Sequence, residues 1–321
     1  MTDQAHKLRA LVGSAELSAD TSAGSLPLVV VTGARAGVGV TTVALNLAAV
    51  LADQGDRVLL VDGAQHGGEP AEISGPRADI KNSLADVIAG KCEIEEAIVE
   101  GPAGLAMLLS PGRVSQKRDV MSRREATTCG DFSRRAQDKL LNALQSVDGA
   151  FDLIVMDAGR GLTPWSRRFW LQSKLNLLVT TPDDNAVLDA YATFKESATE
   201  VVGLPVRLLV NQVDSDMDAV STHRRLESAC QRFLSQSIPA LPALPRHFAS
   251  EFVGASVPPR VWEMPNSPFG HAALWLGRAV SELIGSESSF PRHNCTMAGY
   301  ELEQDPGPLR GHTSRARLRA S

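Results

Sequence analysis

Six short apolar runs, separated by segments of helix length, constrain the fold of this chain more than any other feature. Each run is almost continuously apolar, which is typical of strands that are covered on both faces. The predicted strands are LPLVVVTG (26–33), RVLLVD (57–62), LAMLLS (105–110), FDLIVMDAG (151–159), LNLLVTTP (175–182) and PVRLLVN (205–211). Strands that alternate with helices predict an α/β fold, with a mostly parallel central sheet and helices on both faces.

The segments outside these strands divide the 321 residues into four parts. We expect a short helix over 1–12, a flexible Gly/Ser-rich linker over 13–25, a single α/β domain over 26–285 and a disordered tail over 286–321. The tail has arginines but few apolar residues, so we expect only weak or transient contact with a membrane surface.

Composition limits the cellular compartments and the classes of partner that we expect for this protein. The net charge of -5 argues against DNA as a partner. The four cysteines lack the spacing of metal ligands, which indicates a reducing compartment. No apolar run approaches the roughly 18 residues of a membrane span, and the N-terminus lacks the apolar core of a signal peptide. We therefore expect a cytoplasmic protein, with membrane contact at most peripheral.

The stretch GARAGVGVTT (33–42) has the features of a phosphate-binding loop. It joins the first predicted strand to a helix, and its three glycines allow backbone amides to approach an anion closely. The helix directs the positive end of its dipole at the same space. Thr41 is placed to offer a hydroxyl to Mg²⁺, and Thr42 to a phosphate oxygen. The alternative is a tight strand–helix turn in which the glycines serve packing alone.

This loop resembles the deviant Walker A motif of the MinD/ParA family of ATPases, usually written KGGVGKTT. Arg35 lies where that family has its signature lysine, which reaches the phosphates of the partner subunit in an ATP-sandwich dimer. Val40 lies at the ordinary phosphate-loop lysine. The resemblance implies ATP or ADP and Mg²⁺ as ligands, and a homodimer. The nucleotide-binding residues that it implies are Gly33, Arg35, Ala36, Gly37, Val38, Gly39, Val40, Thr41, Thr42 and Asn211.

Three further stretches resemble landmarks of the same family. RVLLVDGAQ (57–65) keeps Asp62 but has Ala64 in place of the aspartate that positions the attacking water. FDLIVMDAGRG (151–161) resembles the Walker B strand, with Asp157 as an outer carboxylate of the magnesium site. LLVNQVDS (208–215) resembles the strand whose asparagine, here Asn211, hydrogen-bonds adenine. The resemblance thus implies a Mg²⁺ site formed by Thr41, Asp62 and Asp157.

The replacements at positions 40 and 64 are expected to affect ATP hydrolysis more than nucleotide binding. Phosphoryl transfer depends on positioned positive charge and an oriented nucleophile, and removing one such group typically costs ~10²–10³ in rate. With Val40 and Ala64 in place of a lysine and an aspartate, we assign no catalytic residue. We expect ATP hydrolysis to be impaired or absent.

The first residues supply a second, independent resemblance. DQAHKLRALV (3–12) is an amphipathic helix candidate, and it resembles the DQAxxLR segment of the FlhG (FleN) regulators of flagellar number and placement. The resemblance implies an FlhF-type GTPase as partner, stimulated through Asp3, Gln4, Ala5, Leu8 and Arg9. The alternative for this segment is a frayed terminal helix that packs on its own domain.

Two functions therefore remain open. The first is an FlhG-like regulator of flagellar biosynthesis that acts on an FlhF-type GTPase and hydrolyses ATP weakly or not at all. The second is a working MinD/ParA-like switch in partition or division-site placement, in which ATP drives dimerisation and Arg35 replaces the missing charge.

Two further features of the sequence give weaker predictions. The basic stretch 113–135 favours a solvated face over a contact with lipid, DNA or a partner. Trp165 and Trp170 are expected to pack over the edge of the sheet.

Overall fold

A twisted sheet forms the centre of the computed structural model, in the order β3-β4-β2-β5-β1-β6-β7-β8. The structure describes residues 26–64, 81–101, 104–110, 133–200, 204–246 and 259–285. Within them the strands are β1 (Leu28–Gly33), β2 (Val58–Asp62), β3 (Ile98–Glu100), β4 (Ala106–Leu108), β5 (Leu153–Arg160), β6 (Leu175–Thr180), β7 (Val206–Val213) and β8 (Leu244–Pro245). The pair β3–β4 is antiparallel and the other pairs are parallel.

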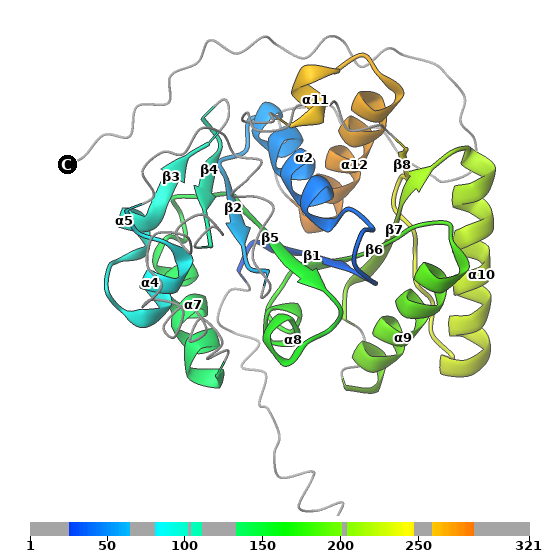
Figure 1. Ribbon diagram of the computed structural model, residues 1–321, viewed down its shortest axis with the longest axis horizontal. Helices are drawn as coiled ribbons and strands as arrows, with labels where there is room; N and C mark the ends of the chain where they lie inside the picture. The colour runs from blue at the N-terminus through cyan, green and yellow to red at the C-terminus, as the bar shows by residue number, and fades with distance from the viewer. Residues whose placement is uncertain are drawn as a thin grey trace, which may run out of the picture.

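Helices cover both faces of this sheet (Figure 1). One face packs against α2 (Val40–Asp53), α11 (Arg260–Glu263) and α12 (Pro268–Ile284). The other packs against α4 (Leu84–Ala89), α5 (Ile94–Ala97), α7 (Arg134–Ser146), α8 (Pro164–Trp170), α9 (Asp184–Glu200) and α10 (Asp216–Leu234). The mostly parallel α/β architecture predicted from the apolar runs is therefore confirmed.

The apolar strands explain this layering. β1, β2 and β6 are buried along their whole length, because helices lie on both of their faces and leave neither face to solvent. Successive residues of a strand point to opposite faces. Val30 of β1 accordingly packs on the α8 side, and Val29 and Val31 pack on the α2 side.

Two strands are not among the six apolar runs identified from the sequence, and both lie at the ends of the sheet. β3 is three residues long and half exposed, and β8 has two residues, one of them a proline. Proline cannot donate a ladder hydrogen bond, so it is tolerated at a sheet edge. Neither segment has the apolar run that marks a central strand.

The prediction for Trp165 and Trp170 was wrong in its location. Both indoles are fully buried on α8, under the middle of the sheet rather than over its edge. Trp170 Nε1 donates to Thr32 Oγ1 of β1 at 2.9 Å, and Trp165 Nε1 donates to the Gly63 carbonyl just after β2 at 2.9 Å. The polar edge of each ring is satisfied, so the rings can fill the core under β1 and β5.

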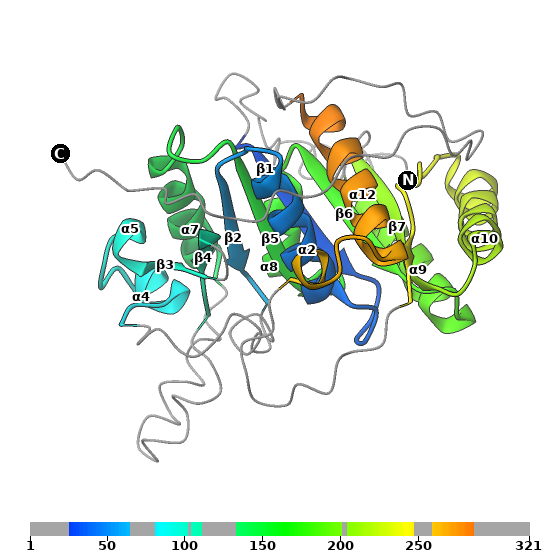
Figure 2. The same cartoon turned by 90° about the horizontal axis from the view of Figure 1, so that it is seen from above.

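The strand order decides where loops can meet. β1, β2 and β5 are neighbours and parallel, so their carboxyl ends lie together at one edge (Figure 2). Consecutive strands β1 and β2 are separated by β5, which makes this edge the switch point where ligands bind in open α/β sheets. The predicted phosphate loop follows β1 at this position.

Candidate phosphate-binding site

The loop between β1 and α2 has a backbone that only glycine adopts readily at two positions. Gly37 and Gly39 have φ of 85° and 88°, in the left-handed region. A Cβ at Gly39 would also lie 2.5 Å from Asn211 Nδ2. Glycine at 39 is therefore required both by backbone conformation and by space.

Two side-chain amides from the end of β7 hold the loop. Asn211 Nδ2 donates to the Val38 carbonyl at 2.8 Å, and Gln212 Nε2 donates to the Gly37 carbonyl at 3.0 Å. Gln212 itself has φ of 58°, which is uncommon outside glycine. Sequence reasoning missed Gln212; its position directly after Asn211, at the end of a strand, was the available signal.

Asn211, the residue predicted to contact adenine, lies near the end of β7. Its side chain is buried, and within the described residues its Oδ1 has no hydrogen-bond partner. A buried amide oxygen left unpaired costs free energy, roughly 1–3 kcal/mol. A donor such as the exocyclic amine of adenine would remove that cost, so the residue suits the predicted ligand.

Thr41, Asp62 and Asp157 meet at the start of α2. Thr41 Oγ1 donates to Asp157 Oδ2 at 2.6 Å, and the Gly159 amide donates to Asp157 Oδ1 at 2.9 Å. Asp62 of β2 lies opposite Asp157 in the strand register. The three residues predicted to hold Mg²⁺ are thus brought together by α2, β2 and β5.

The electrostatics of this corner suit a divalent cation. Both aspartates are buried, and Asp62 Oδ2 has no hydrogen-bond partner in the described part of the chain. Burial, and then the charge of Asp157, raise the pKa of Asp62 to about 7. Carboxylate and hydroxyl oxygens are the ligands that Mg²⁺ prefers. The residues therefore fit a magnesium ion.

The start of α2 likewise suits an anion. Gly39 is the N-cap, and as a glycine it has no side chain to accept a hydrogen bond from the first turn of this helix. The amides of that turn carry the positive end of the helix dipole. Thr42 is the third residue of α2, in the same turn, and its carbonyl accepts from Asn46 Nδ2 at 2.7 Å. Together with the loop glycines, this turn fits a phosphate group.

Val40 and Ala64 supply no charge to the site. Val40 is 9% exposed and packs into the apolar cluster between the sheet and α2. Its methyl group, with that of Val38, occupies the space that a Cβ on Gly33 would need. Ala64 lies beside Gly159, with its Cβ 3.3 Å from the position of an added Cβ there. The site thus presents backbone amides and oxygen ligands for a cation, but at positions 40 and 64 it has neither the lysine nor the carboxylate described above.

Arg35 forms ion pairs within its own chain. Its Nη1 lies 3.6 Å from Asp183 Oδ1, and its Nε lies 3.8 Å from Asp189 Oδ2. The Thr181 hydroxyl, then the Ala186 amide and Arg35, hold the pKa of Asp183 below its usual value. Arg35 is only half buried, so these pairs are weak. The neighbouring Ala36 is exposed on the outside of the loop.

Some of the residues singled out from the sequence lie outside the described residues. These are the predicted partner-binding residues Asp3, Gln4, Ala5, Leu8 and Arg9, the tail over 286–321 and most of the basic stretch 113–135. Of that stretch, Arg134 and Arg135 begin α7.

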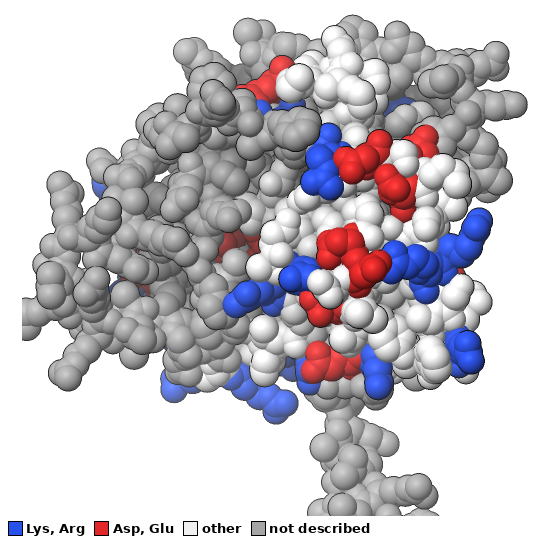
Figure 3. Space-filling model, turned by 45° about the vertical axis from the view of Figure 1, so that its right-hand side comes forward, with Lys and Arg blue, Asp and Glu red and all other residues white. Residues whose placement is uncertain are grey.

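The described surface over α9 and α10 carries acidic and basic side chains interspersed (Figure 3). One pair on this face is Arg225 with Asp184, at 2.7 Å. None of the helices in the described part of the chain combines the length and apolar character that crossing a bilayer requires.

Comparison with known protein families and curated proteins gives consistent matches. Residues 27–182 match a family model described as an AAA domain. The antiactivator FleN of Pseudomonas aeruginosa is 26% identical over 280 residues, covering 79% of this chain and 93% of FleN. The septum site-determining protein MinD of Synechocystis is 27% identical, covering 59% of this chain and 66% of MinD. The flagellum site-determining protein YlxH of Helicobacter pylori is 27% identical, covering 63% of this chain and 64% of YlxH.

Solved structures show the same fold. MinD of Pyrococcus horikoshii, solved with Mg-ADP, superposes with a TM-score of 0.62 at 23% identity, covering 82% of this chain and 98% of MinD. The MinC:MinD complex of Aquifex aeolicus gives a TM-score of 0.58 at 21% identity, covering 83% of this chain and 99% of the matched chain. At these identities the likeness concerns the fold alone.

Proposed function

The chain belongs to the MinD/ParA family of P-loop proteins, and on that premise we propose that it is a FleN-type regulator of flagellar biosynthesis. The main support is the similarity to FleN, which extends over 93% of the length of that protein. A second relative, YlxH, is named for determining the flagellar site. The DQAxxLR pattern of residues 3–9 supports the same choice.

In this proposal the α/β domain binds an adenine nucleotide with Mg²⁺ and hydrolyses it slowly or not at all. Thr41, Asp62 and Asp157 would hold the metal, which neutralises phosphate charge when bound. The first turn of α2 would hold phosphate oxygens, and Asn211 Oδ1 would accept from the base. Solved MinD with Mg-ADP supports the choice of ligand. Val40 and Ala64 support slow hydrolysis, since neither can stabilise charge or orient water.

The output of the protein would be stimulation of an FlhF-type GTPase by the N-terminal segment. An amphipathic helix can dock its apolar face in a groove, and the sequence pattern would place Leu8 on that face. Gln4 and Arg9 would then be available for polar contacts at the GTPase site, where an oriented water and a positive charge accelerate hydrolysis.

The test measures GTP hydrolysis by the cognate FlhF-type GTPase in the presence of the full chain. We expect wild type to accelerate hydrolysis and Arg9→Ala to lose most of that acceleration. Lys7→Ala is the matched control, since Lys7 lies in the same segment but outside the DQAxxLR pattern. No acceleration by saturating wild-type protein would overturn the proposal.

The second candidate is an ATP-dependent dimerisation switch. Arg35 favours it, because a guanidinium stands where the family has the lysine that reaches the partner subunit. This function requires Arg35 to leave Asp183 and Asp189 when the dimer forms. Light scattering with Mg·ATP and with Mg·ADP separates the two functions. A dimer seen only with ATP, and abolished by Arg35→Ala, would establish the switch.

A further inference from the structure

Arg160 ends β5 at the edge of the sheet where the phosphate loop lies. It follows Asp157 by three residues and is exposed. It is flanked by Gly159 and Gly161, whose φ values are 72° and 69°. Within the described part of the chain, no hydrogen bond or ion pair engages its guanidinium. The charge of Arg160 is therefore available to a ligand at this edge of the sheet.

The register of β1 and β5 determines the face on which Arg160 lies. Val31 pairs with Asp157 and Gly33 pairs with Arg160, so β5 has one more residue than β1 between the two pairs. This is a β-bulge. A one-residue shift moves a side chain to the other face, so the bulge returns Arg160 to the face of Asp157. Without it, Arg160 would lie on the face covered by α8.

That face is the one with α2 and the phosphate loop. Val31 packs in the apolar cluster of α2, and a Cβ on Gly33 would point at Val38 and Val40. The residue paired with Gly33 therefore leaves the sheet beside the phosphate loop.

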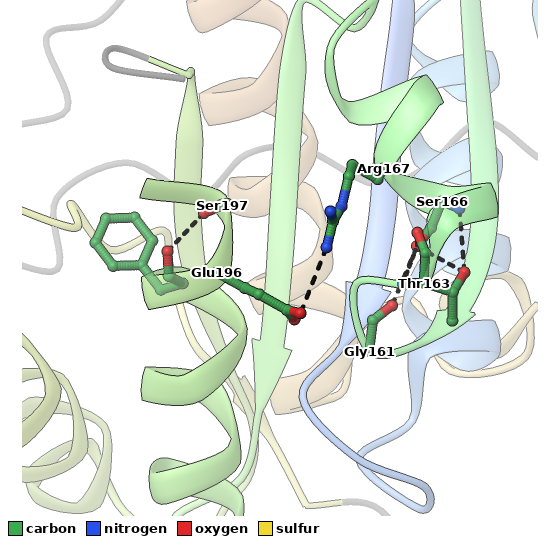
Figure 4. Close-up of polar contacts among 7 residues, drawn as sticks. Gly161, Thr163, Ser166, Arg167, Glu196 and Ser197 are labelled. Atoms are coloured by element: carbon green, nitrogen blue, oxygen red, sulfur yellow. Dashed lines mark hydrogen bonds and ion pairs between the residues drawn. The ribbon is translucent and has the colours of Figure 1, made fainter. Parts of the chain in front are cut away.

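The backbone at Arg160 is anchored on its carboxyl side. The Gly161 amide donates to the Gly33 carbonyl at 2.8 Å. Figure 4 shows the Ser166 hydroxyl bonded to the Gly161 carbonyl, at 3.2 Å, next to the Thr163–Ser166 capping box of α8. Arg160 is thus held beside the loop by both β1 and α8.

The other described cations near the site are already paired with carboxylates. Arg167 points away to Glu196, at 3.4 Å (Figure 4), and Arg35 faces two aspartates. Val40 is neutral. A polyphosphate would therefore meet the carboxylates of Asp62 and Asp157 and, among the described residues of this face, the guanidinium of Arg160.

We propose that Arg160 binds the β- and γ-phosphates of the nucleotide and supplies the positive charge that Val40 does not. Guanidinium grips phosphate bidentately, in a fork that a lysine lacks. This assignment rests on the nucleotide-binding part of the proposed function.

The test is calorimetric titration of the full chain with Mg·ATP, Mg·ADP and AMP. We expect Arg160→Ala to bind ATP and ADP about 10- to 100-fold more weakly, the worth of a charged hydrogen bond. AMP, which lacks the β- and γ-phosphates, should bind the variant and wild type alike. Arg160→Lys should recover part of the affinity. Arg224→Ala, at an exposed arginine of α10, is the matched control.

The outcomes separate this inference from the proposed function. Wild type that binds ATP no more tightly than Arg160→Ala overturns the role of Arg160 alone. Wild type that binds neither ATP nor ADP overturns both the role of Arg160 and the nucleotide-binding part of the proposal. Equal loss for AMP and ATP would show a general defect, and would also contradict a phosphate-specific contact. Thermal unfolding without nucleotide verifies that each variant is folded.

Discussion

At position 40 a lysine would place a charge at the phosphates, whereas the valine that is present contributes apolar burial to the core. Val40 begins α2, is 9% exposed and fills space against Gly33. Burying a valine contributes about 1.5–3 kcal/mol. A lysine here would exchange most of that burial for a charge at the phosphates. Position 64, just after β2, is comparable: an aspartate would supply a carboxylate, whereas the methyl group of Ala64 lies against Gly159.

The double variant Val40→Lys with Ala64→Asp should restore ATP hydrolysis. Each substitution returns a group whose removal typically costs ~10²–10³ in rate, so we expect Mg²⁺-dependent phosphate release to rise at least ~10²-fold over wild type. The single variants serve as controls and should each gain less. A double variant that binds ATP tightly yet releases phosphate no faster would show that another part of the machinery is missing.

β5 joins the site to the rest of the sheet, and its two ends have different roles. At its carboxyl end lie Asp157 and the bulge. Just before its first residue, Asp152 accepts from Arg57 Nη2 at 2.6 Å and from Arg57 Nε at 3.0 Å. The Asp152 amide donates in return to the Arg57 carbonyl at 2.8 Å. This pair fixes the start of β5 against the start of β2.

The Arg57–Asp152 pair should give a small pH dependence to stability. Hydrogen bonding to Arg57 holds the pKa of Asp152 below its usual value. The stabilisation is therefore present at neutral pH and is lost as pH falls through that lowered pKa. We expect Asp152→Asn to lower the free energy of unfolding by at most about 1 kcal/mol at pH 7, because the pair is exposed.

Urea unfolding between pH 7 and pH 3.5 measures this effect. The difference between wild type and Asp152→Asn should shrink as the pH falls. Asp148→Asn, at an exposed aspartate nearby, is the control. A difference that stays constant across the range would contradict the assignment to Asp152.

At the scale of elements, the sequence predicts those strands and loops that have a local residue pattern of their own. The six apolar strands and the glycine loop were found because burial on both faces and left-handed backbone leave a compositional signature. β3 and β8 are too short for one, since pairing with a neighbour defines them rather than their own residues. The bulge that orients Arg160 and the amide contact of Gln212 arise from register between distant segments. No single stretch of sequence encodes the bulge, and for Gln212 the available signal was its position directly after Asn211, which does not specify its contact with the loop.

Across the whole molecule, the site draws on β1, β2, β5 and β7 at one edge of the sheet. A ligand bound there contacts segments far apart in the chain and is released when the domain unfolds. Binding therefore stabilises the native state by mass action. Asp62 Oδ2 and Asn211 Oδ1 have no hydrogen-bond partner among the described residues. They would add to this effect, because each would gain a partner in the proposed complex.

Mg·ATP should raise the unfolding temperature. At a concentration 100 times Kd the gain is about 2.7 kcal/mol, which corresponds to roughly 5–10 °C for a domain of this size. GTP should give a smaller shift, because guanine presents a carbonyl to Asn211 Oδ1 where adenine presents an amine. Differential scanning fluorimetry with and without EDTA measures both effects. Equal shifts with ATP and GTP would contradict the role given to Asn211.

The indole of Trp165 gives the molecule an optical readout of its own. Its N–H donates to the carbonyl of Gly63, the residue between Asp62 and Ala64. A change in polarity or a displacement at this strand end alters that hydrogen bond, and indole emission is sensitive to such a change. Occupancy of the site can therefore be followed by intrinsic fluorescence, without a dye or a labelled nucleotide, and a Trp165→Phe variant identifies the share of the signal that comes from this ring.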